Sequence, residues 1–144
     1  MKQNKIAIVY DFDGTLTPKS MQEYTLLPKL GIKSQRFWEM IVREAKETGG
    51  ESMMIYMRQL LDHAKEKNIK ISKYEFFKMG KDIQYYNGVI DWFKNIDKYV
   101  KKLSSGEVEI YHYIISAGHM EILDGISIKK YIKKIFASEY FYNA

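Results

Sequence analysis

Two aspartates spaced one residue apart, Asp11 and Asp13, are the side chains in this sequence whose chemistry is easiest to anticipate. They follow an apolar, β-favouring run at residues 5–10 and are followed by a glycine and two threonines within residues 14–17. Side chains alternate between two faces in an extended segment, so we expect both carboxylates to point the same way where a strand ends. Carboxylates this close repel each other, which raises one pKa or recruits a cation. One aspartate could then attack phosphorus while the other, held protonated, donates a proton to the leaving oxygen.

The residues around this pair suit a cation and a tight loop. Mg2+ prefers carboxylate and carbonyl oxygens and usually keeps waters and a substrate phosphate in its shell, so we expect Asp11 and Asp13 to be its ligands. Gly14 allows a sharp turn, and the hydroxyls of Thr15 and Thr17 can hold the carboxylates. Asp and Gly are also common in ordinary turns, so an unspecialised turn after a strand is an open alternative at this point.

A second apolar, β-branched and aromatic run, residues 108–115, predicts another buried strand and is followed by Ser116, Ala117 and Gly118. We expect these three residues to turn into a short helix, where the Ser116 hydroxyl and the next two backbone N–H groups can donate to phosphate oxygens. In an open α/β sheet, ligands lie beyond the carboxyl ends of the strands. Asp11 and Ser116 are therefore expected to share one pocket.

The segment D-F-D-G-T-L-T, residues 11–17, resembles the first motif, D-x-D-G-T-x-T, of the haloacid dehalogenase superfamily of phosphohydrolases. Residues 113–118 resemble its second motif, an apolar strand that ends in Ser or Thr. The order of the two motifs matches the family, and phosphoserine-phosphatase-like members share the first string and carry a helical cap. A second aspartate at position 13 favours a phosphatase over a dehalogenase.

The resemblance implies a role for each matched residue. Asp11 would be the nucleophile that forms an aspartyl-phosphate, and Asp13 the general acid and base. Mg2+ would be held by the Asp11 side chain and the Asp13 main-chain carbonyl. The phosphate-binding residues implied in this way are Thr15, Ser116, Ala117 and Gly118.

The resemblance also implies a helical cap that closes over the site, excludes water and selects a small phosphorylated metabolite. Glu23 and Tyr24, close to the expected hinge, are possible substrate contacts. His119 is a third, although a histidine in the first turn of a helix needs no such role.

The order of expected elements is strand, several helices, strand, helix and strand, which indicates an α/β protein. We expect a Rossmann-like parallel sheet, incomplete with about three strands, formed by residues 1–19 and 106–144, and a helical cap inserted at residues 20–105. Apolar periodicity and capping residues predict helices that begin at Ser34, near Glu51, after Ser72 and after Asn87.

The family's third motif, a lysine, and its fourth, a set of acidic residues, have no match after Ser116. We therefore expect the chain to be the N-terminal part of a longer protein, with weak or absent activity by itself. The first strand would then have an unpaired apolar edge, which favours a homodimer or another covering. A non-catalytic binding module on the same scaffold and a phosphotransferase are the alternatives to a hydrolase.

Composition narrows the class of protein. The 144 residues are 46% hydrophobic and 28% charged, include no cysteine and carry a formal net charge of +5. No apolar run approaches the roughly 18 residues of a membrane helix, and the N-terminal apolar run is too short for a signal peptide. We therefore expect a cytoplasmic protein without a membrane partner. The lysines are spread along the chain, so nucleic-acid binding is not favoured either.

Overall fold

The computed structural model describes residues 4–142, which form an α/β fold. None of the helices in this range combines the length and the apolar character that a membrane crossing needs. The elements are, in order, β1 (Lys5–Tyr10), α1 (Met21–Tyr24), α2 (Leu26–Leu30), α3 (Ser34–Thr48), α4 (Ser52–Glu66), α5 (Lys73–Met79), η1 (Gly80–Asp82), α6 (Val89–Leu103), β2 (Glu109–His119), α7 (Met120–Asp124), η2 (Lys129–Tyr131) and β3 (Ile132–Ser138).

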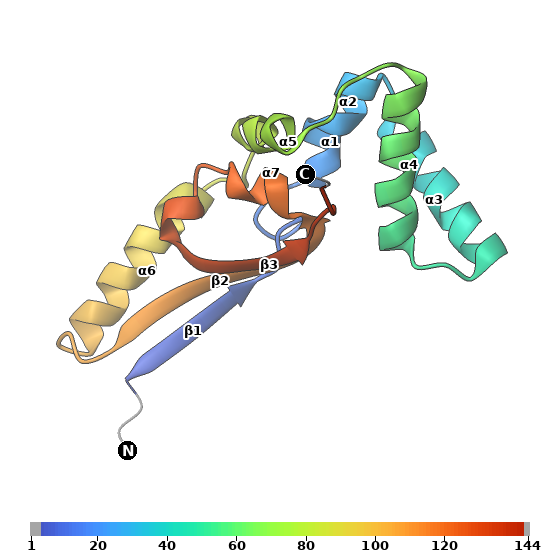
Figure 1. Cartoon of the computed structure of the whole chain (residues 1–144). Coiled ribbons are helices and arrows are strands. Elements are labelled where there is room, and N and C mark those ends of the chain that lie inside the picture. The colour runs from blue at the N-terminus through green and yellow to red at the C-terminus, as the bar shows by residue number, and fades with distance from the viewer. Residues whose placement is uncertain (1–3, 143–144) are drawn as a thin grey trace.

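The three strands form one parallel sheet in the order β1-β2-β3, which confirms the predicted fold class. Helix α6 packs against β2, and α7 contacts both β2 and β3. Figure 1 shows α5, α6 and α7 on the same side of the sheet. The contact with α6 is aromatic: the Phe93 ring is buried, 5.5 Å from the ring of Tyr10 and 5.0 Å from that of His112.

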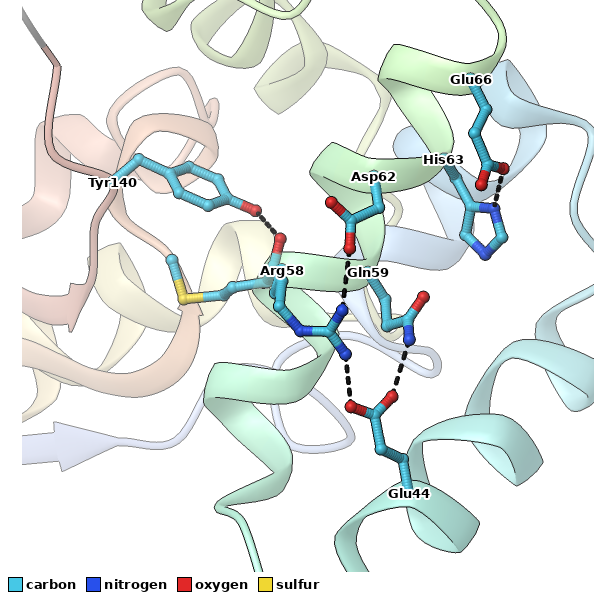
Figure 2. A network of polar contacts seen from close by, with 8 residues as sticks. Glu44, Arg58, Gln59, Asp62, His63, Glu66 and Tyr140 are labelled. Atoms are coloured by element: carbon cyan, nitrogen blue, oxygen red, sulfur yellow. Dashed lines mark hydrogen bonds and ion pairs between the residues drawn. The ribbon is translucent and has the colours of Figure 1, made fainter. Parts of the chain in front are cut away.

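Helices α3 and α4 form a hairpin that extends away from the sheet (Figure 1). Each helix buries one apolar face, which includes Phe37 and Leu60. On the outside, Glu44 of α3 accepts hydrogen bonds from Arg58 and from Gln59 of α4, the latter at 2.7 Å (Figure 2). The hairpin is therefore closed by apolar packing inside and by a polar network at its surface.

Helices α5 and α6 lie on the helix-covered side of the sheet and do not form part of the α3–α4 hairpin (Figure 1). Helix α5 packs against α7, and the approach is close at two glycines. A Cβ atom on Gly80 would lie 2.4 Å from the backbone carbon of Gly125. The division into a core of residues 1–19 and 106–144 and a cap of residues 20–105 stays a prediction. Because of these contacts, we propose a narrower cap that ends before α5.

Three local predictions can be compared with the structure. The Ser72 side chain accepts a hydrogen bond from the Glu75 N–H at 3.2 Å, which confirms it as the N-cap of α5. Asn87 was wrong as the cap of α6, because the helix is preceded by Gly88 in a left-handed conformation with φ +90°. Strand β2 continues to His119 instead of ending at Ile115, so the segment predicted as a turn is strand.

Candidate active site

The loop after β1 is wound around one backbone carbonyl. The Phe12 oxygen accepts the N–H of Leu16 at 2.9 Å and those of its two neighbours at 3.2 and 3.3 Å. The Phe12 side chain is fully buried and anchors the loop to the core. Gly14 has φ +81°, a left-handed conformation that costs other L-residues about 1–2 kcal/mol. This turn presents Asp11 and Asp13 at the carboxyl end of β1.

The two carboxylates have different surroundings. Asp11 is exposed, and its Oδ2 lies 3.4 Å from the Thr15 hydroxyl, which donates to it. Asp13 is partly buried, and its Oδ1 accepts the Met21 N–H at 2.9 Å. The pKa of Asp13 is raised to about 6, chiefly by burial and to a smaller extent by the charges of Asp11 and Glu23, while the hydrogen bond from Met21 opposes the rise. Asp13 therefore exchanges its proton close to neutral pH, as a general acid and base must.

Thr17 does not hold a carboxylate, contrary to expectation. Its side chain is fully buried, and its hydroxyl lies 2.8 Å from the Lys19 carbonyl and 3.3 Å from that of Phe12. The Thr17 hydroxyl thus binds the loop backbone, and of the two threonine hydroxyls only that of Thr15 donates to an aspartate carboxylate.

The parallel register brings the second predicted segment beside the first. Tyr10 pairs with Ile114, so Asp11 and Ser116 both follow paired positions at the same edge of the sheet. Met21 connects the two segments, because its N–H binds Asp13 while its sulfur lies 3.2 Å from the backbone nitrogen of His119.

The Ser116 side chain is nearly buried, and its oxygen accepts the Gly118 N–H at 3.0 Å. This bond leaves the serine hydroxyl proton free to be donated, but it already uses the N–H predicted to bind phosphate. Gly118 is also closely packed, since a Cβ atom there would lie 2.1 Å from Met21 Cε. The Ala117 carbonyl accepts the Tyr56 hydroxyl at 2.6 Å. The phosphate-binding roles of these residues stay predictions.

His119 is buried behind this edge of the sheet. Its ring lies 5.3 Å from that of Phe76 and 5.2 Å from that of Tyr140. Its Nε2 is 3.2 Å from the Tyr140 hydroxyl, and its Nδ1 is 3.4 Å from Gln22 Nε2. Burial lowers the pKa of His119 to about 4, so the ring is neutral. His119 is the last residue of β2 and precedes the first turn of α7, so it does not lie in that turn as considered above. Its contact with a substrate stays a prediction.

The other two possible substrate contacts lie in α1. Glu23 is partly buried and accepts the Ser20 hydroxyl at 3.1 Å. Tyr24 is also partly buried, and burial raises the pKa of its hydroxyl. Both residues lie close enough to Asp13 to interact with its charge: the Glu23 carboxylate raises the pKa of Asp13, and the Asp13 carboxylate raises the pKa of Tyr24.

Sequence reasoning missed Tyr56 and Glu121. The Tyr56 side chain extends from α4 to Ala117, near the end of β2. The pKa of its hydroxyl is raised, mainly by burial and secondly by the negative charge of Asp13. Glu121 is 2% exposed, and its Oε1 accepts the Tyr140 N–H at 3.0 Å and the Tyr142 hydroxyl at 2.8 Å. No local pattern distinguishes either residue from an ordinary helix position.

Residues 4–142 contain no group of three or more His, Asp or Glu side chains placed to hold a metal ion. The loop does offer the exposed Asp11 carboxylate next to Asp13, whose main-chain carbonyl is an additional oxygen donor. Mg2+ is commonly bound by one or two carboxylates together with waters and substrate phosphates. These oxygen donors therefore fit Mg2+ better than a closed zinc site, which needs four nitrogen or sulfur ligands.

No protein-family model matches the chain. It is 28% identical over 146 residues to an uncharacterized protein of Borreliella burgdorferi, in an alignment that covers 96% of this chain and 51% of that protein. Its structure is similar to one described as a phospho-aspartyl intermediate analogue of phosphoserine phosphatase, with a TM-score of 0.62 and 19% sequence identity. That match covers 98% of this chain and 59% of the other. The chain thus spans about half the length of the curated relative, and the structural similarity shows a fold like that of the solved phosphatase.

Proposed function

We propose that this chain carries the nucleophile and the general acid of a Mg2+-dependent phosphomonoester hydrolase. The observation that supports this most is the contrast between two neighbouring carboxylates: Asp11 is exposed, whereas burial raises the pKa of Asp13 to about 6. Paired carboxyl groups whose surroundings separate their pKa values are typical of acid–base assignments in enzymes. The fold shared with a phosphoserine phosphatase captured as a phospho-aspartyl analogue supports the same chemistry.

In the first step, an Asp11 carboxylate oxygen attacks phosphorus and forms an acyl phosphate while the bond from phosphorus to the ester oxygen breaks. Protonated Asp13 donates its proton to the departing oxygen. In the second step, the Asp13 carboxylate takes a proton from water as the water oxygen attacks phosphorus, which releases phosphate and restores Asp11. One carboxyl group thus serves as acid and then as base.

Neighbouring groups would orient the reactants. The Thr15 hydroxyl holds Asp11, and the Ser116 hydroxyl can donate to a phosphate oxygen because its own oxygen is fixed by Gly118. The Asp11 carboxylate and the Asp13 main-chain carbonyl would hold Mg2+, which supplies positive charge to the phosphoryl group.

We propose a small phosphorylated metabolite as the substrate. Helix α4 reaches the site through Tyr56, so the α3–α4 hairpin can limit the space above it. Glu23 and Tyr24 are candidates for contacts with the rest of the substrate. The net charge of +5 favours the approach of an anion.

The test compares wild type, Asp11→Asn, Asp13→Asn and the control Asp91→Asn, which changes an exposed aspartate on α6. Each protein is incubated with Mg2+ and p-nitrophenyl phosphate, released phosphate is measured, and acid-quenched protein is weighed for the gain of one phosphoryl group. We expect Asp11→Asn to lose both signals and the control to keep them.

Phosphate release that is unchanged in Asp11→Asn would refute the role of Asp11 as nucleophile. Because weak or absent activity is expected of this chain by itself, the same assay is also run on the chain joined to the part of the Borreliella burgdorferi protein outside the aligned region. Neither phosphate release nor a phosphoryl adduct from that longer protein would contradict the hydrolase and favour the non-catalytic binding module. A phosphotransferase would instead show the adduct but release phosphate slowly until an acceptor other than water is added.

A further inference from the structure

A cavity of about 400 Å3 lies where α2, α3 and α4 meet. It is lined by Gly31 at the end of α2, by residues at the start of α3, and by His63 and Lys67 at the end of α4. Pockets of this size hold small organic ligands. Tyr56, through which α4 contacts the candidate active site, lies about 10 Å from His63 along the helix, at about 1.5 Å per residue. The cavity is therefore separate from that site.

The cavity is strongly basic, and we call it the basic cavity. The basic side chains that line it are Lys33, Arg36, His63 and Lys67, and none of the described residues that line it is acidic. Lys33 and Arg36 are exposed, and neither forms an ion pair within residues 4–142. A concave site lined by charges of one sign attracts counter-ions, so the basic cavity favours an anionic ligand.

The other two basic side chains are held by neighbouring groups. The Lys67 Nζ donates to the Leu30 carbonyl, which positions the ammonium group and leaves its charge without a counter-ion. His63 Nδ1 lies 3.3 Å from Glu66 Oε2, and Figure 2 shows this pair on α4. In the part of the chain that the structure describes, three positive charges at the basic cavity thus have no carboxylate partner.

Part of the basic cavity is apolar. Phe37, whose side chain is fully buried, lines it together with Ile32 and Met40, which are partly buried. An inorganic ion would leave this apolar surface in contact with water, whereas a ligand with a carbon skeleton would cover it. The two kinds of lining together therefore fit an organic anion better than an inorganic one.

We propose that the basic cavity binds a small organic phosphate. Its phosphate group lies between Lys33, Arg36 and Lys67, and its carbon skeleton packs against Phe37 and Met40. A phosphate monoester carries close to two negative charges at neutral pH, which suits several cations better than the single charge of a carboxylate. The planar guanidinium of Arg36 can donate two parallel hydrogen bonds to phosphate oxygens, and the lysines act as point charges. The proposal does not depend on phosphatase activity.

The probe is phenylphosphonate, which joins a phosphonate group to an apolar ring and has no ester bond to hydrolyse. It is titrated into isotope-labelled wild-type protein with EDTA present, and the backbone amide signals are followed by NMR. We expect the signals of Gly31, Arg36 and Lys67 to shift. Inorganic phosphate should shift the same signals only at higher concentration, because it does not cover the apolar lining. Benzyl alcohol, which has no charge, should bind at least about tenfold more weakly than phenylphosphonate.

Variants test the contribution of the charges. Arg36→Gln should weaken the binding of phenylphosphonate about tenfold, because it removes a charge-assisted hydrogen bond. Arg43→Gln is the matched control and should leave the affinity unchanged, because it replaces another exposed arginine of α3 that does not line the cavity. Circular dichroism first establishes that each variant is folded, and Lys33→Gln replaces Arg36→Gln if that variant is not.

Three outcomes would overturn the proposal. Shifts confined to residues 11–17 and 116–118 would place the probe in the candidate active site, which would refute a second phosphate site and leave the proposed hydrolase intact. The absence of any shift, or equal weakening by Arg36→Gln and Arg43→Gln, would show that the basic cavity does not bind the phosphonate group. Binding of benzyl alcohol as tight as that of phenylphosphonate would show that the positive charges do not select the ligand.

Discussion

Replacing Asp13 by asparagine should stabilise the protein at neutral pH while removing the proposed acid. Burial raises the pKa of the Asp13 carboxyl from 3.8 to about 6. The folded protein therefore holds this proton more tightly than the unfolded chain, and stability that is present below pH 3.8 is lost as the pH rises to about 6. A rise of about two in the pKa corresponds to about 3 kcal/mol in the free energy of unfolding.

Asparagine has no charge to bury, and its carbonyl oxygen can still accept the Met21 N–H. We expect Asp13→Asn to raise the free energy of unfolding by about 2–3 kcal/mol near pH 7.5 and by close to zero near pH 3.5. Urea unfolding followed by the fluorescence of Trp38 and Trp92 measures both values. The wild-type and variant proteins share every other titrating group, so their difference isolates this one.

Asp91→Asn is the control and should change stability by less than about 0.5 kcal/mol at either pH, because surface substitutions usually do. An Asp13→Asn protein whose difference from wild type is the same at the two pH values would refute the argument, since it would mean that burial does not raise the pKa of Asp13. A loss of stability near pH 7.5 would refute it as well.

Two further predictions concern the contacts around the site. Tyr56→Phe should lower the free energy of unfolding by about 1–2 kcal/mol in the same urea assay, because the Ala117 carbonyl loses its 2.6 Å hydrogen bond. The control Tyr74→Phe, which changes an exposed tyrosine, should leave the free energy of unfolding nearly unchanged. Equal effects of the two substitutions would contradict a stabilising role of the bond. Gly118→Ala should lower the free energy of unfolding, because its Cβ would lie 2.1 Å from Met21 Cε and the Met21 side chain is fully buried, which restricts its movement away. A double-mutant cycle with Met21→Ala should show a coupling of at least about 0.5 kcal/mol. Additive effects would mean that the two side chains do not meet.

The polar network between α3 and α4 illustrates how an element can be predicted without its partners. Apolar periodicity predicted helices near residues 34 and 51, and α3 and α4 begin at Ser34 and Ser52. Periodicity describes which face of a helix is apolar but not which helix covers it. The bonds from Arg58 and Gln59 to Glu44 appear only once the hairpin has formed.

The sequence by itself determined the elements and the loop that carries the candidate chemistry. Strand β1, the turn at Gly14 and the order of the two motifs depend on neighbouring residues, so their patterns are readable along the chain. The placement of the Asp11 and Asp13 carboxylates just after the end of a strand follows from the same short segment.

Tertiary structure alone decided which of these groups are buried and what they touch. Burial raises the pKa of Asp13, encloses His119 between rings from α5 and the chain's end, and places Tyr56 against Ala117. Desolvation and hydrogen bonding depend on atoms that are distant in sequence, and the alternation of residues along β2 does not tell which of its faces a helix will cover. Which face of the sheet the helices cover, and how tightly the Asp13 carboxyl holds its proton, are therefore properties of the folded chain.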